Sequence, residues 1–158
     1  MSYHITKGIV PGMIAFIMVF NLSCKKSEAD GGKMKAPVRT YLVTARIDKK
    51  GANSDSEGTA VFRGAYSEES KLLVYSLEYQ DIVPQEITLR SGAKGSYGSL
   101  VKELYNRGKE PVSDKPIAGS LILSPLQERN LLKGQWFVAI NTLVMIPEIS
   151  GIVTLKQM

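Results

Sequence analysis

The chain has 158 residues, 44% of them hydrophobic and 22% charged, with a formal net charge of +5. This length suits one globular domain that can bury a core of its own. A single cysteine excludes an internal disulfide. The positive charges are scattered along the chain without interleaved aromatic residues, which argues against a nucleic-acid-binding surface.

The first 24 residues have the pattern of a secretion and lipidation signal. Lys7 precedes an apolar run over residues 9–20, and this run is shorter than the roughly 20 apolar residues of a spanning helix. Residues 21–24, Asn-Leu-Ser-Cys, resemble the lipobox of bacterial lipoproteins. The resemblance implies a signal peptide over residues 1–23, cleavage before Cys24, and attachment of a diacylglycerol and an acyl chain to that cysteine.

The lipobox resemblance also implies where the protein is held. Two or three acyl chains anchor a protein to a bilayer almost permanently, whereas one chain binds only marginally. Lys25 and Lys26 follow the cysteine in place of the aspartate that marks inner-membrane retention in this family, which favours the outer membrane. Residues 24–37 are polar and glycine-containing, without an apolar period, and predict a flexible tether.

Residues 38–158 are expected to form one domain built mostly of strands. The run over 38–47 alternates between apolar and polar residues, and 58–66 repeats this pattern. A turn at 67–70 joins this run to 71–79, and the two runs predict a hairpin. The run over 71–79 is apolar on both faces, which suits a strand in the middle of a sandwich. Further strands are predicted over 85–90, 117–123, 135–142 and 148–158, and 99–107 fits either a strand or one helical turn.

One helix is predicted by its capping residues. Ser124 suits the N-cap, Pro125 the first helical position, and Gln127 completes a Ser-x-x-Gln capping box. Gly134 stands where a left-handed residue ends a helix. The apolar stripe of this helix is expected to consist of Leu126, Leu131 and Leu132. Seven or eight short strands with this helix at one end predict an all-β, antiparallel sandwich.

The order of these segments resembles the chordin-type domain over roughly residues 39–155. The matching segments are Gly58–Ala60 with Phe62, LVYSL at 73–77, GAKGSYG at 92–98, LLKG at 131–134, WFVAIN at 136–141 and EISG at 148–151. The resemblance implies an immunoglobulin-like sandwich with a distant likeness to copper-zinc superoxide dismutase. The family's His-x-His positions are Thr88 and Arg90 here, and Pro147 and Ser150 replace its usual glycine and arginine.

Three residues are candidates for contact with a partner. Lys94 and Tyr97 lie in the 92–98 glycine loop, where exposure is expected, and Arg90 occupies one of the family's histidine positions. The loop lacks the Lys-Ser/Thr pair and the strand–helix context of a phosphate-binding P-loop, so a plain hairpin loop is the better interpretation. A further hypothesis pairs Arg90 with Glu148.

Four aromatic residues are candidates for a platform on which sugar rings stack: Trp136, Tyr97, Tyr105 and Tyr79. A lone tryptophan inside an apolar run such as WFVAI is more typical of a core, and Trp136 is expected to be buried.

The sequence predicts neither catalytic residues nor a metal or cofactor site. His4 is the only histidine and leaves with the signal peptide, which removes the imidazole of Ser–His catalysis and of zinc or copper ligation. The prediction is a lipid-anchored cell-envelope protein with a non-catalytic binding, adhesion or structural β-sandwich. It is held on the membrane through Cys24, with another envelope protein or a glycan as candidate partners. Two alternatives stay open: a metal-dependent redox or hydrolytic enzyme of dismutase-like fold, and a glycan-binding module.

Overall fold

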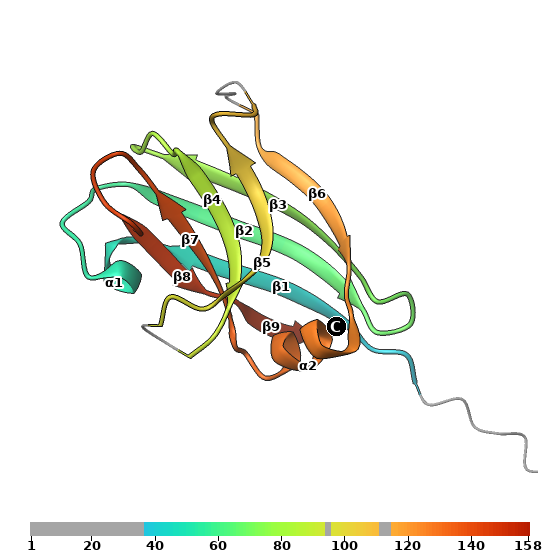
Figure 1. The fold of residues 1–158 in the computed structure, drawn as a ribbon. Coiled ribbons are helices and arrows are strands. Elements are labelled where there is room, and N and C mark those ends of the chain that lie inside the picture. Colours follow the sequence, from blue (N-terminus) through green and yellow to red (C-terminus); the bar gives the residue numbers. More distant parts are fainter. Residues whose placement is uncertain (1–36, 94–95, 111–114) are drawn as a thin grey trace, which may run out of the picture. The chain divides into compact units, whose positions relative to one another are not determined.

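Two antiparallel β-sheets share one core in the computed structural model, which describes residues 37–93, 96–110 and 115–158 (Figure 1). The strands are β1 (Thr40–Ile47), β2 (Thr59–Ser67), β3 (Leu72–Gln80), β4 (Glu86–Ser91), β5 (Ser99–Asn106), β6 (Ile117–Ile122), β7 (Trp136–Asn141), β8 (Ile149–Ile152) and β9 (Thr154–Gln157), and the helices are α1 (Lys49–Ala52) and α2 (Pro125–Leu132). The five-stranded sheet has the order β6–β3–β2–β1–β9 and the four-stranded sheet the order β5–β4–β7–β8. The predicted all-β, antiparallel sandwich is therefore confirmed.

Alternating side chains of β1 and β2 point into the core, as the sequence predicts. Val43, Ala45 and Ile47 are buried on β1, and Phe62 and Tyr66 are buried on β2. Successive residues of a strand face opposite sides, so the polar positions between them face outward. Burying a side chain such as Phe62 contributes about 1.5–3 kcal/mol.

The hairpin between β2 and β3 is confirmed, with Ser67 opposite Leu72 and an unbroken register to Thr59 opposite Gln80. β3 lies between β2 and β6, in the interior of its sheet. Only one of its faces is buried, however, because Val74 is 50% exposed. The predicted central position of this strand is therefore confirmed, but its second apolar face is exposed and not buried.

The chain crosses between the two sheets after β3, β5, β6 and β8. The run over 99–107, which fitted a strand or a helical turn, forms β5 and pairs with β4 through two register shifts. The predicted final strand is two strands in different sheets. Val153 divides them: it is buried, and its N–H donates to the Trp136 carbonyl at 2.8 Å.

Helix α2 has the predicted caps but not the predicted apolar stripe. The Ser124 hydroxyl accepts from the Gln127 N–H, and the Gln127 side chain accepts from the Ser124 N–H. Gly134 follows the helix with φ of +67°. Of the three leucines, Leu131 is buried whereas Leu126 and Leu132 are exposed.

A polar cluster holds α2 against the five-stranded sheet. Glu128 accepts hydrogen bonds from the Tyr66 hydroxyl at 2.6 Å and from the Lys71 ammonium at 2.7 Å. Lys71 and Tyr66 hold the pKa of Glu128 below its ordinary value. Burial, reinforced by Glu128, raises the pKa of Tyr66. These contacts explain why a single buried leucine suffices to seat the helix.

Candidate functional site

An apolar groove of about 440 Å³ lies against the four-stranded sheet. Phe137 and Ile152, which are opposite each other on β7 and β8, form its apolar floor. Phe137 alternates with the core residues Trp136 and Val138, so it faces the outer side of the sheet. The remaining wall residues include Ala52, Asn53, Tyr97, Gln135 and Pro147.

Helix α1 forms one wall of the groove and lies between the two strands predicted over 38–47 and 58–66. The Asp48 side chain accepts from the Lys50 N–H at 2.9 Å, and Asn53 ends the turn with φ of 55°. Gly51 packs directly on β8, because a Cβ there would lie 1.9 Å from the Ser150 carbonyl oxygen. The capping Asp48 and the pair Gly51 and Asn53 were the local signals for this helical turn.

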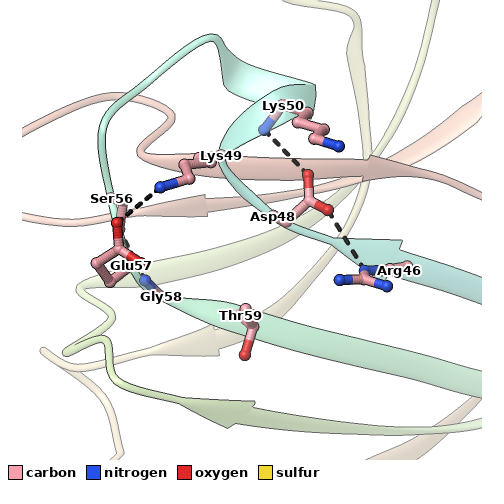
Figure 2. A pocket seen from close by; sticks show the side chains of 8 residues that line it. All are labelled: Arg46, Asp48, Lys49, Lys50, Ser56, Glu57, Gly58 and Thr59. Carbon is pink, nitrogen blue, oxygen red and sulfur yellow. Dashed lines mark hydrogen bonds and ion pairs between the residues drawn. The ribbon is translucent and has the colours of Figure 1, made fainter.

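Helix α1 also borders a charged pocket of about 370 Å³ (Figure 2). The Lys49 Nζ lies 2.6 Å from the Glu57 Oε1, and the Arg46 Nε lies 3.4 Å from the Asp48 Oδ2. The Glu57 carboxylate raises the pKa of Lys49, and Lys49 lowers the pKa of Glu57. Exposed ion pairs of this kind contribute little to stability. The pocket therefore consists largely of mutually neutralised, solvated charges.

The structure brings Arg90 and Tyr97 together beside the groove. The Arg90 guanidinium donates from Nε to the Tyr97 carbonyl at 2.7 Å and from Nη2 to the Gly98 carbonyl at 3.2 Å. Its central carbon lies 4.1 Å from the centroid of the Tyr97 ring, in a cation–π arrangement. Tyr97 is exposed, as expected for a contact residue. The third candidate, Lys94, lies outside the described residues, as do Cys24 and the signal peptide.

The hypothesis that Arg90 pairs with Glu148 is wrong. Arg90 is opposite Phe137, whereas the Glu148 N–H donates to the carbonyl of Ile140, which is opposite Ile87. Three residues along β4 separate the two positions by roughly 10 Å, at about 3.4 Å per residue.

Glu148 instead organises the loop before β8. Its carboxylate accepts from the Ser56 hydroxyl at 2.6 Å and from the Thr142 hydroxyl. These two donors lower the pKa of Glu148.

The loop between β7 and β8 exposes a run of apolar side chains that no sequence motif marks. Leu143 is 86% exposed and Val144 88%, and Met145 and Ile146 are also exposed. The Thr142 hydroxyl fixes the base of the loop by accepting from the Val144 and Met145 N–H groups at 3.1 and 3.3 Å. The next residue, Pro147, lines the groove, so loop and groove are adjacent.

The four aromatic residues do not form one platform. Trp136 is buried, as expected, and Tyr105 is also buried. Tyr79 and Tyr105 line a cleft between β5 and β6, whereas Tyr97 lines the groove on the other side of the four-stranded sheet. A sugar-stacking platform built from all four residues is therefore contradicted.

The comparisons with known proteins add no relative: no family model matches the chain, and no curated protein and no solved structure is similar to it. The class that the geometry itself defines is the antiparallel β-sandwich. Within residues 37–93, 96–110 and 115–158, no three His, Cys, Asp or Glu side chains are grouped so that they could hold a metal ion. In the same ranges, no helix is long and apolar enough to cross a membrane.

Proposed function

We propose that this protein is a lipid-anchored component of a bacterial cell envelope, and that its β-sandwich is a non-catalytic binding module. The groove over Phe137 and Ile152 is the observation that carries the binding role. Binding sites are typically concave and mostly apolar, with a few polar groups that orient the ligand. Here Asn53 and Gln135 supply the polar groups, and strands together with a capped turn supply rigid walls.

The ligand that this groove suits has an apolar body. Phe137, Ile152 and Pro147 offer apolar surface, and Arg90 places a cation beside it, over the Tyr97 ring. The exposed loop over 143–146 extends the apolar surface beyond Pro147. An apolar segment of another envelope protein fits this combination better than a glycan, because Arg90 already covers one face of Tyr97, the exposed aromatic ring.

A fluorescent apolar anion, anilinonaphthalene sulfonate, tests the groove. Ile152, 44% exposed, lies in the groove, and Val74, 50% exposed, lies on the other sheet, so Ile152→Lys and Val74→Lys are a matched pair. We expect saturable dye fluorescence with wild type and Val74→Lys, and its loss with Ile152→Lys. Both variants add a positive charge, which attracts the dye, so a loss cannot come from charge repulsion. Equal fluorescence from the two folded variants would refute the groove as the binding site.

The anchor rests on the lipobox resemblance of residues 21–24 and has its own test. We expect the wild-type chain to partition into detergent and to carry the mass of its acyl chains, and Cys24→Ala to remain in the aqueous phase. If wild type and variant were equally water-soluble, the anchoring proposal would be refuted, whereas the proposal for the groove would be unaffected.

The metal-enzyme alternative has little support in the chain's chemistry. Thr88 and Arg90 occupy the two positions where the chordin-type family has histidine. The Arg90 guanidinium is a cation engaged by two carbonyl groups, and a threonine hydroxyl is a poor substitute for imidazole. Elemental analysis of the purified, folded protein tests this alternative, because stoichiometric copper or zinc would support a metal-dependent enzyme.

A further inference from the structure

Strand β6 is an edge of the five-stranded sheet and lacks the charges and prolines that usually block an edge. Its sequence, Ile-Ala-Gly-Ser-Leu-Ile, contains neither a charge nor a proline. It pairs with β3 in unbroken register, from Leu72 opposite Ile122 to Leu77 opposite Ile117. Natural edge strands are normally protected by charged side chains, bulges, prolines or a covering segment, because their free N–H and C=O groups otherwise pair with another chain.

The other edges of the described sheets are protected. β9 has only four residues, one of them Lys156. β5 contains Lys102 and Glu103 and is irregular at two positions. β8 is covered by α1, and its Ser150 bridges to Asp48 at the end of β1.

Among the described strands, β6 pairs only with β3, so its other side has no strand partner. A cleft of about 430 Å³ separates β5 from β6, so β5 does not pair with this edge. The cleft is lined by Ala118, Gly119 and Ser120 of β6 and also by Lys102, Glu103, Glu110 and Lys115. On the outer face of the sheet, Ile122 is 72% exposed. Its diagonal neighbour on β3 is Val74, which is in register with Ser120 of β6 and, on the other side, with Ala65 and through Ala65 with Leu42. On the outer face, the apolar row of Leu42, Ala65 and Val74 therefore reaches the edge strand at Ser120, with Ile122 diagonal to Val74.

We propose that two copies of this chain associate through β6, antiparallel about a two-fold axis, so that two five-stranded sheets become one ten-stranded sheet. A second copy fits because β6 is self-complementary: it is uncharged, so no like charges meet across the axis. Since β6 is the one unprotected edge among the described strands, pairing closes at a dimer and does not continue into a fibre.

The side-chain alternation of a strand restricts the register of this pairing. Opposed residues of the two copies must face the same side of the sheet, so one residue of β6 lies opposite its own equivalent at the two-fold axis. The two central choices for this residue are Gly119 and Ser120. With the axis at Ser120, Ile122 of one copy lies opposite Ala118 of the other and loses part of its exposure. With the axis at Gly119, Ala118 lies opposite Ser120. An interface of one six-residue strand is small, so we expect a dissociation constant on the order of micromolar.

The double variant Ala118→Lys, Ser120→Lys tests the pairing. In either central register it sets lysine opposite lysine, and both positions are exposed in the single copy, so the fold is expected to persist. Gln80→Lys with Gln157→Lys is the matched control, because it adds the same charge at exposed strand positions outside β6. Circular dichroism and thermal melting establish that both variants are folded.

Sedimentation equilibrium of the purified full chain in density-matched detergent is the measurement. We expect a monomer–dimer equilibrium for wild type and control, and a dissociation constant raised about tenfold or more in the β6 variant. In wild type, amide hydrogen exchange of residues 117–122 is expected to slow as concentration rises. A wild type that stays monomeric, a β6 variant that dimerises like wild type, or protection of β6 that appears only with a different protein would each overturn the proposal.

Discussion

The hydroxyl of Thr88 is buried without a hydrogen-bond partner among the described residues, so we expect Thr88→Val to stabilise the domain. Valine keeps the β-branched shape and nearly the same volume, and therefore changes little besides the hydroxyl. An unsatisfied buried hydroxyl costs about 1–3 kcal/mol in mutational data. We expect a gain of about 1 kcal/mol in the free energy of unfolding, which corresponds to roughly 3–6 °C in Tm for a domain of this size.

Thr142→Val is the matched control for this prediction. Thr142 is also buried, but its hydroxyl accepts from the Val144 and Met145 N–H groups and donates to Glu148. Removing it leaves bonded partners unsatisfied, and we expect a loss of about 1–3 kcal/mol. Urea unfolding of wild type and both variants at one temperature measures the difference. If Thr88→Val destabilised the domain as much as Thr142→Val, the Thr88 hydroxyl would have a partner and the reasoning would fail.

Three further substitutions test the capped and charged elements. The carboxylate of Glu128, whose pKa Lys71 and Tyr66 lower, adds stability that is complete above its unfolded-state pKa and is lost as the pH falls through its folded-state pKa. Glu128→Gln should therefore flatten the acid loss of stability below about pH 5 in urea titrations. Ser124→Ala removes the N-cap of α2 and should lower the free energy of unfolding by about 0.5–2 kcal/mol, measured by urea unfolding. Gly51→Ala forces a Cβ toward the Ser150 carbonyl and should both lower Tm and weaken dye binding in the groove.

The parts of the fold that could be predicted from sequence are those that local chemistry determines. Alternation in β1 and β2 identified the buried faces because a strand has a period of two. The cap of α2 was readable because Ser124, Pro125 and Gln127 act within one helical turn. Burial of Trp136 followed from its apolar neighbours.

Features set by tertiary contacts could not be predicted in the same way. The leucines of α2 form a periodic pattern in the sequence. The helix is instead held against the sheet by Glu128, whose partners Tyr66 and Lys71 are distant in sequence. Arg90 was assigned to Glu148 on family position alone, whereas the carbonyl groups of the adjacent loop lie closer and satisfy the guanidinium. The groove has no sequence signature, since its walls come from four separate segments.

The two proposed surfaces use different sheets, and this separation makes their roles compatible. The groove lies against β7 and β8 of the four-stranded sheet, whereas β6 is an edge of the five-stranded sheet. Pairing through β6 therefore leaves Phe137 and Ile152 accessible in each copy, and a dimer would present two grooves. It follows that Ile152→Lys should abolish dye binding without changing the dimer dissociation constant, and that Ala118→Lys, Ser120→Lys should weaken the dimer without changing dye binding per chain. A variant that altered both properties would show that the two surfaces are one.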